Sequence, residues 1–390
     1  MSSARIDNAP AAPIRFTFDG RSYEGRAGDT IASALLANGV RIVGRSFKYH
    51  RPRGIFGAWT EEPNAVVDVT LGGRTTPNLR ATTEPLVEGM LVRSVNAAPT
   101  AEGDRVAFLD RFSAFIPAGF YYKTFLWPDW HLFEPSIRNM AGLGKVDPAN
   151  RPAADWPQIN VTCDVLVIGG GPAGLAAAKA AASAGKSVIL LDDRPEVGGS
   201  LLHRGGTVDG KPGKEWAASV AAKLAAAGHR VLTDTTAYGI YDHNLVCAWQ
   251  RRPGRVDAQW KIRAKSIVVA AGAIERPLVF ADNDRPGVMS ADAALWYLRR
   301  HGVLVGERIV IAANNSSVAP VAAALAAAGA SVTIADLRPD ARAPEGVALV
   351  NGKVEAVHGR RGVEAVTIAG ERIAADALLV SGGGTPTVHL

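Results

Sequence analysis

A strand–helix–strand pattern that occurs twice, at a constant offset of 144 residues, constrains the fold of this chain most strongly. In each copy an apolar strand leads into an Ala-rich helix that stops at a glycine, and a second strand follows. The first copy comprises 164–168, 175–184 and 187–191, and the second comprises 308–312, 320–328 and 331–335. Strands that alternate with helices form parallel sheets with helical crossovers. We therefore predict an α/β fold of the two-dinucleotide-binding-domain (FAD/NAD(P)-binding, Rossmann-like) type.

The first copy carries a glycine fingerprint between its strand and its helix, Gly169-Gly-Gly171-Pro-Ala-Gly174, and Asp192 ends its second strand. We expect Gly169 to permit a sharp turn, Gly171 to let a pyrophosphate approach the backbone, and Gly174 to let helix and strand pack closely. The helix N-terminus favours the negative charge of the phosphates. Asp192 is placed to accept hydrogen bonds from adenosine ribose hydroxyls, which favours NAD or FAD over NADP.

Three further segments are expected to approach the same nucleotide. Gly198-Gly199-Ser200 follows Asp192 closely, the run 234–237 could offer backbone groups to the adenine, and Ala271-Gly272 ends an apolar strand with a glycine turn. Each alone is compatible with ordinary loop geometry. Together with the fingerprint they predict a site.

The second copy has lost the fingerprint. At the same offset, Ala313, Asn315 and Val318 replace the three glycines, so side chains occupy the positions where a pyrophosphate needs bare backbone. We predict that this domain keeps its fold and has no phosphate site. A reductase that passes electrons from nicotinamide to flavin needs two working sites, and this sequence predicts one.

The N-terminal region predicts a small β-grasp domain. Two strands meet at Asp19-Gly20, a helix over 31–38 follows a capping Asp29 or Thr30, and further strands are expected at 65–71 and 86–95. The next region, 101–160, is rich in aromatic residues, and its stretch 120–133 is too aromatic for a free linker. We expect it to be buried against a domain of this chain or against a partner subunit.

Several function classes are excluded by composition. The chain has two cysteines, Cys163 and Cys247, too few and too far apart for a cluster, a zinc ribbon or a redox pair. The scattered histidines predict no metal site, and no signal peptide or membrane-spanning run of about 18 apolar residues is present. We therefore expect a cytoplasmic protein. A net charge of +6 is spread along the chain, and the basic stretch 41–53 predicts a solvated face or subunit contact, so no nucleic-acid partner is expected.

Three segments that occur in one order resemble a known family. They are the stretch 44–54 (GRSFKYHRPRG), the stretch 115–125 (FIPAGFYYKTF) and the fingerprint, followed by the closing stretch 381–390. Together they resemble the N-terminal part of the alpha subunit of heterotetrameric sarcosine oxidase, over essentially the whole chain. Opine oxidase and hydrogen cyanide synthase subunits share this organisation but are less similar.

The resemblance implies a part in the oxidative demethylation of sarcosine to glycine, with hydrogen peroxide and a one-carbon unit (formaldehyde or methylenetetrahydrofolate) as products. It implies beta, gamma and delta partner subunits, an FAD in the beta subunit that oxidises the amine, and an FMN at the interface with the beta subunit. It also implies that this chain binds NAD that does not turn over, and that no catalytic residue lies on it.

The resemblance also implies the NAD contacts, namely Ala173, Asp192, Asp193, Arg194, Ser200 and Ala237. With the residues inferred from the fingerprint, the full candidate set is Gly169, Gly171, Pro172, Ala173, Gly174, Asp192, Asp193, Arg194, Gly199, Ser200, Ala237, Ala271 and Gly272. Two departures from the family stand out. No cysteine precedes Cys163, so the N-terminal domain is expected to hold no [2Fe–2S] cluster, and the folate-binding domain of the family is expected to be missing, as in a fragment or short form.

Two alternatives remain open at this stage. The same site could hold FAD in a subunit of an opine or amino-acid dehydrogenase, or the chain could be a non-catalytic scaffold. The expected domains are 1–100 (β-grasp, ferredoxin-like, without cluster cysteines), 101–160 (aromatic connecting segment), 161–300 (first dinucleotide-binding domain), 301–375 (second, degenerate Rossmann-like domain) and 376–390 (return to the first).

Overall fold

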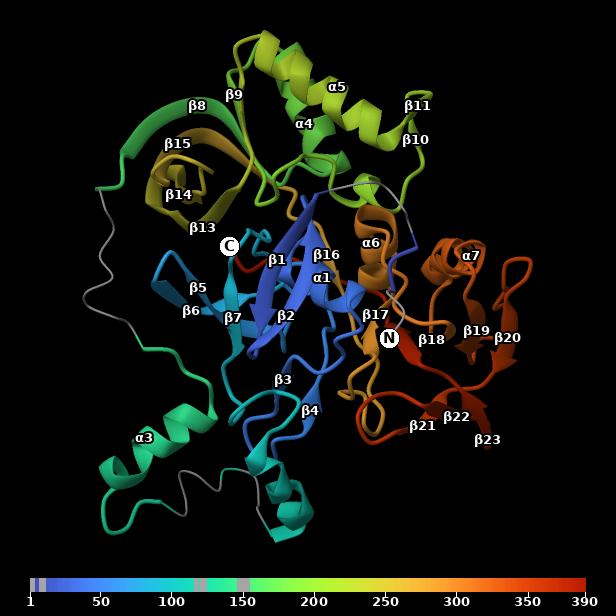
Figure 1. Ribbon diagram of the computed structural model, residues 1–390. Helices are drawn as coiled ribbons and strands as arrows, with labels where there is room; N and C mark the ends of the chain where they lie inside the picture. Colours follow the sequence, from blue (N-terminus) through green and yellow to red (C-terminus); the bar gives the residue numbers. More distant parts are fainter. Residues whose placement is uncertain (1–3, 7–11, 116–118, 120–124, 146–154) are drawn as a thin grey trace. The chain divides into compact units, whose positions relative to one another are not determined.

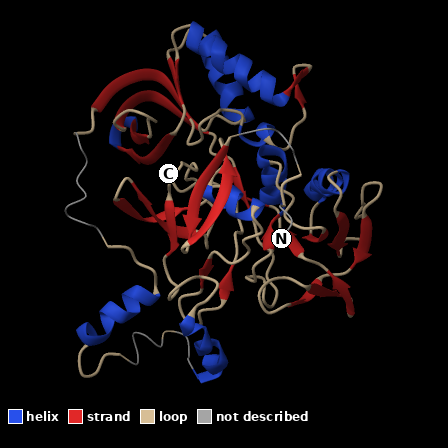
Figure 2. Cartoon of the chain, in the orientation of Figure 1, coloured by secondary structure: helices blue, strands red, loops and turns tan. Residues whose placement is uncertain are grey.

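The structure is a computed structural model that describes residues 4–6, 12–115, 119, 125–145 and 155–390. The chain divides into two compact units. One unit comprises Met1–Asn150 and Glu275–Gly383, and the other comprises Arg151–Ile274 and Gly384–Leu390. Figure 1 follows the chain by colour through both units, and Figure 2 distinguishes the helices from the strands. The short strands β16 (Ala273–Glu275) and β25 (Gly384–Pro386) lie where the chain passes between the units. The domain boundaries inferred from the sequence stay predictions.

The first unit begins with a five-stranded sheet of β-grasp type. Its order is β2-β1-β7-β5-β6, with β1 and β7 parallel at the centre. The expected turn at Asp19 and Gly20 is present, because both residues have positive φ, and Thr30 caps the helix as expected. The elements are β1 (Pro13–Phe18), β2 (Arg21–Arg26), α1 (Ile31–Ala37), β3 (Gly44–Arg45), β4 (Pro52–Arg53), β5 (Val66–Leu71), β6 (Arg74–Arg80) and β7 (Leu91–Ser94).

The strand expected over 86–95 is wrong in its first half. Only Leu91–Ser94 forms a strand, because Gly89 has φ +77° and the N–H of Leu86 bonds to the Asp29 carbonyl at the start of the helix. An apolar run in the sequence does not show where such a turn interrupts it.

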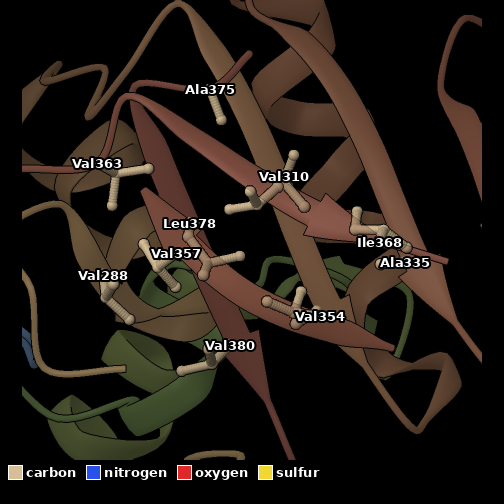
Figure 3. Packing of buried hydrophobic residues seen from close by; sticks show 12 residues of the cluster. Val288, Val310, Ala335, Val354, Val357, Val363, Ile368, Ala375, Leu378 and Val380 are labelled. Atoms are coloured by element: carbon tan, nitrogen blue, oxygen red, sulfur yellow. The ribbon is translucent and has the colours of Figure 1, made fainter. Parts of the chain in front are cut away.

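The first unit also contains the second strand–helix–strand copy. A parallel sheet of order β17-β24-β18-β19-β20 is joined to a three-stranded antiparallel sheet, β21-β22-β23. Valine, isoleucine and leucine side chains of both sheets form one buried cluster, which Figure 3 shows around Val310, Leu378 and Ile368. The elements are β17 (Val288–Ser290), α6 (Ala291–His301), β18 (Arg308–Ala313), α7 (Ala319–Ala327), β19 (Ser331–Asp336), β20 (Ala348–Asn351), β21 (Val354–His358), β22 (Ala365–Ile368), β23 (Glu371–Ala374) and β24 (Ala377–Ser381).

The second unit is built on a six-stranded sheet of order β12-β9-β8-β15-β14-β13. Strands β8, β9, β12 and β15 are parallel, and the two helices α4 and α5 pack on one face of them through Leu175, Val220 and Leu224. The elements are β8 (Gln158–Ile168), α4 (Pro172–Ser183), β9 (Val188–Leu191), β10 (Thr207–Val208), β11 (Lys211–Pro212), α5 (Gly213–Ala226), β12 (Arg230–Leu232), β13 (Thr235–Tyr241), β14 (Leu245–Gln250) and β15 (Ala258–Val269).

Most of the aromatic region, 101–160, belongs to the first unit, and residues 155–160 belong to the second. Residues 116–118, 120–124 and 146–154 of the region lie outside the described residues. Its described elements are a 3-10 helix over Arg105–Phe115 and α3 (Trp130–Met140). Phe125 and Phe133 contact each other, with ring centroids 4.9 Å apart, but Trp127 is 84% exposed and Phe115 is 83% exposed. The described chain therefore does not bury these last two side chains, and burial against a partner subunit stays a prediction. No described helix is long and apolar enough to cross a bilayer.

A buried carboxylate in the first unit joins three segments that are far apart in the sequence. The Asp29 side chain is 2% exposed and lies 2.7 Å from an Arg5 guanidinium nitrogen and 3.3 Å from Nδ1 of His301. It also accepts hydrogen bonds from the N–H of Arg26 and the hydroxyl of Ser33. Burial raises the pKa of Asp29, but these hydrogen bonds and the Arg5 charge outweigh burial, so the net pKa is lowered.

This lowered pKa predicts how stability depends on pH. A carboxyl whose pKa is lower in the folded state stabilises the protein above its unfolded pKa, about 3.9, and that contribution is lost as pH falls through the folded value. Asp29→Asn should lower the free energy of unfolding by about 2 kcal/mol at pH 7 and by less below about pH 4. Urea unfolding at a series of pH values measures the loss of unfolding free energy at pH 7 and at low pH. An equal loss at pH 7 and pH 3 would contradict the ion-pair account.

Candidate nucleotide-binding site

Two of the three fingerprint glycines are required by the backbone itself. Gly169 follows strand β8 with φ +105°, and a Cβ on it would lie 2.3 Å from the Ala270 carbonyl oxygen. A Cβ on Gly174 would lie 1.8 Å from the carbonyl oxygen of Gly169. Real Cβ atoms do not approach backbone this closely, so the turn and the contact between β8 and α4 depend on glycine at both positions. The packing reasons given for them from the sequence are therefore confirmed.

Gly171 is different, because the space around it is open. It has an extended backbone, and a Cβ on it would meet nothing closer than the Gly199 Cα at 3.9 Å. Gly171 is the N-cap of α4, and Pro172 occupies the first helical position. The N–H groups of a first helical turn have no intrahelical partner, so those at the start of α4 favour an anion at this helix end. The geometry leaves room for an anion beside bare backbone.

The carboxylate of Asp192 lies at the same turn and is buried. One oxygen accepts the N–H of Gly170 at 2.6 Å and the other accepts the N–H of Arg194 at 2.9 Å, and the residue is 7% exposed. Burial raises the pKa of Asp192 to about 6, despite these two donors. Each carboxylate oxygen keeps a second lone pair for a further donor such as a ribose hydroxyl.

The other predicted site residues differ in how they contact this turn and in how exposed they are. Arg194 is joined to the start of β13 by the bond from the N–H of Asp234 to its carbonyl, and Ala237 lies on β13 three residues further on. Gly199 approaches Gly171 so closely that a Cβ on it would lie 2.9 Å from the Gly171 Cα. The remaining residues are Asp193, which is half-buried, Ser200, which is exposed, Ala271, whose N–H lies against Gly169, and Gly272, which has φ +73°.

One residue of the turn, Gly170, was not among those predicted from the sequence. Its N–H binds Asp192 and its carbonyl accepts the N–H of Gly198 at 2.8 Å, and a Cβ on it would lie 2.7 Å from an Asp192 oxygen. The sequence did carry a signal for this residue, because Gly170 is the middle one of three consecutive glycines. Glycine is needed at this position because of the Asp192 side chain, which is distant in the sequence.

The corresponding turn of the second copy is filled by its own side chains. The Asn315 side chain accepts the N–H of Ser317 and donates to the Ser381 carbonyl. Asp336, at the position that matches Asp192, forms an ion pair with Arg338 at 2.8 Å, and Arg338 also reaches Ser316. These contacts support the prediction that this domain has no phosphate site.

Two further kinds of candidate site remain, a metal site and the basic stretch 41–53. Within the described ranges, no group of three or more His, Cys, Asp or Glu side chains is placed to hold a metal ion. Two cations of the basic stretch 41–53 form ion pairs within the chain, Arg51 with Asp110 and Arg53 with Asp284. These ion pairs agree with a structural role for the stretch.

Comparison with known proteins identifies two families within the chain. Residues 11–97 match the family described as "2Fe-2S iron-sulfur cluster binding domain", and residues 164–266 match "FAD dependent oxidoreductase". The second match includes the fingerprint and Asp192. The first match contains no cysteine, although iron–sulfur clusters are held by cysteine thiolates. The residues of the first match therefore do not fit the cluster.

Longer relatives extend over almost the whole chain. The alpha chain of the sarcosine oxidase of Rhizobium meliloti (strain 1021) is 45% identical over 97% of this chain, and that of Corynebacterium sp. (strain U-96) is 37% identical over 100%. This chain spans about two fifths of the length of these relatives, 40% and 39% respectively. An opine oxidase component of Rhizobium meliloti (strain 1021) is 27% identical over 38% of this chain and 32% of that protein.

One solved structure supports the fold. The L-proline dehydrogenase from P. horikoshii superimposes with a TM-score of 0.67 at 22% identity, covering 99% of this chain and 63% of that one. The chain therefore shares the fold of that structure over nearly its whole length.

Proposed function

This chain is a relative of sarcosine oxidase alpha subunits over nearly its whole length, and we propose that it forms the nucleotide-binding part of such a subunit. One observation carries the proposal. The fingerprint turn of the first copy has open space beside Gly171, whereas the corresponding turn of the second copy is filled by its own side chains. A single open turn suits a protein that holds a dinucleotide without passing hydride between two of them. The whole enzyme would demethylate sarcosine oxidatively, and the amine chemistry would take place on a partner subunit.

We propose that the bound nucleotide is NAD. The pyrophosphate would lie beside Gly171 at the N-terminus of α4, and the adenosine ribose would lie beside Asp192. A buried carboxylate at the ribose disfavours a 2′-phosphate by charge repulsion. When bound, NAD would place the negative charge of its pyrophosphate at this turn. The proposed contacts remain the thirteen residues named from the sequence.

The same site could take FAD, and the matched family description favours this alternative. The chain would then belong to a flavin-dependent opine or amino-acid dehydrogenase. The lower identity to the opine oxidase component makes this the second candidate. FMN and FAD on the beta subunit, with gamma and delta subunits as further partners, complete the first proposal.

We further propose that the N-terminal domain holds no iron–sulfur cluster and serves as structure or as a contact surface. Because residues 11–97 contain no cysteine, electrons would not pass through this domain. Iron and sulfide analysis of the purified chain checks this directly.

Titration of NAD against pH tests the proposed role of Asp192. Its carboxyl has a raised pKa of about 6, so it is ionised above that pH and protonated below it. A ribose hydroxyl donates to the ionised form, so NAD affinity should rise as pH increases through about 6. Asp192→Asn should bind NAD about tenfold more weakly and lose this pH dependence. Unchanged affinity in the variant would exclude Asp192 as a ribose contact.

A further inference from the structure

One cavity of the second unit lies away from the fingerprint. It has a volume of about 700 Å³ and is lined by the first residues of β8, β9 and β12 and by parts of β14 and β15. The fingerprint lies at the opposite, carboxyl ends of β8 and β9 (Figure 1). No residue of the candidate nucleotide site lines this cavity. It is therefore a separate feature of the same sheet.

Four basic side chains line the cavity, and we call it the basic groove after them: His229, Arg230, Lys261 and Arg263. No aspartate or glutamate is among its lining residues. A hollow lined by charges of one sign concentrates ions of the opposite sign.

The pairing of the strands places two of these cations together. Lys261 is paired with Asn160, and Arg263 with Thr162, across the parallel strands β15 and β8. Because directly paired residues point to the same face of a sheet, both cations and both polar side chains share one face. Their donors could therefore act on a single ligand.

None of the four basic side chains has a carboxylate partner in the described part of the chain. Lys261 donates to the Gln158 amide oxygen at 2.8 Å, Arg263 reaches the His243 carbonyl at 3.3 Å, and Arg230 lies over the Trp260 ring. His229 accepts the N–H of Val188 at Nδ1, so its ring proton is on Nε2, which can donate. These partners are all neutral, which leaves the positive charge of the groove uncompensated by protein.

The acidic residue next to the groove is already occupied. Asp164 follows the lining residue Cys163, and its carboxylate lies 2.7 Å from the Lys265 ammonium. It also accepts the N–H and the hydroxyl of Ser187. Asp164 is therefore not available to neutralise the groove.

We propose that the basic groove is a second ligand site, for a small organic anion that carries two or more phosphate or carboxylate groups. The volume is within the range of about 300–1,000 Å³ that small-molecule sites occupy. The site is independent of the proposed nucleotide site.

Inorganic pyrophosphate is the probe that tests this proposal, by calorimetric titration of the full chain with and without saturating NAD. The double variant Lys261→Gln/Arg263→Gln should weaken pyrophosphate binding at least tenfold, and the affinity of the unchanged chain should fall as salt is added. The matched control is Lys223→Gln/Arg255→Gln, which removes two exposed cations of the same unit outside the groove. This control should bind as the unchanged chain does.

The possible results separate the two proposals. Binding that persists with NAD present and is lost only in the groove variant supports the basic groove, whether or not NAD itself binds. Binding that NAD abolishes and the groove variant retains would assign the pyrophosphate to the fingerprint and overturn the inference. No binding at millimolar pyrophosphate would overturn it as well. Thermal unfolding of both double variants, expected to match the unchanged chain, guards against loss by misfolding.

Discussion

Gly171→Ala should weaken nucleotide binding about a hundredfold while leaving the fold intact, and Gly174→Ala should disrupt the fold itself. A Cβ on Gly171 enters open space, where we place the pyrophosphate, and φ at this position is −71°. A Cβ on Gly174 would lie 1.8 Å from a backbone oxygen, so β8 and α4 must separate. We expect that separation to cost about 3 kcal/mol or more.

Thermal unfolding and NAD titration of both variants measure the two effects separately. We expect an unchanged melting temperature with lost binding for Gly171→Ala, and a large fall in melting temperature for Gly174→Ala. Ala176→Gly, at an exposed position on the same helix, controls for the general cost of exchanging Gly and Ala. Full NAD affinity in folded Gly171→Ala would mean that the phosphates do not lie beside this residue.

Glu62→Gln should lower the free energy of unfolding of the first unit by about 3 kcal/mol, although Glu62 lies in no proposed site. Its buried carboxylate accepts four backbone N–H groups. The N–H groups of Phe56 and Gly57 reach one oxygen at 2.7 and 2.6 Å, and those of Asn64 and Ala65 reach the other at 2.6 and 2.9 Å. A glutamine offers one oxygen, so two of these donors would face an NH₂ group.

The neighbouring Glu61 supplies the control for this prediction. It accepts the N–H groups of Ala58 and Trp59 through a single oxygen, which the amide oxygen of glutamine can replace. Glu61→Gln should therefore cost less than about 1 kcal/mol. Denaturant unfolding of both variants measures the difference, and equal losses would show that the four-donor arrangement is not what stabilises this loop.

The fingerprint and its fold could be predicted from the sequence because their causes are local. Gly169 and Gly174 are specified by a turn and a contact within a few residues, and the 144-residue offset exposes the second copy directly. The loss of glycine at Asn315 likewise indicates a lost phosphate site without any knowledge of the structure. Periodicity and glycine spacing were sufficient for these features.

The features that could not be predicted depend on long-range contacts. Nothing in the sequence near Asp29 indicates that Arg5 and His301 meet it, because those residues come from opposite ends of the first unit. The basic groove arises in the same way, since strands about a hundred residues apart, β8 and β15, both contribute to its lining. Local sequence patterns do not predict contacts between residues that are far apart in the sequence.

The central claim, that this chain carries NAD and leaves the redox chemistry to a partner, has one direct test. The purified chain is denatured, and the released nucleotide is identified by chromatography and absorbance. We predict NAD with no flavin. Released FAD would contradict the claim and favour a flavin-dependent dehydrogenase. Protein that releases no nucleotide and binds none when NAD is added would contradict it in favour of a scaffold.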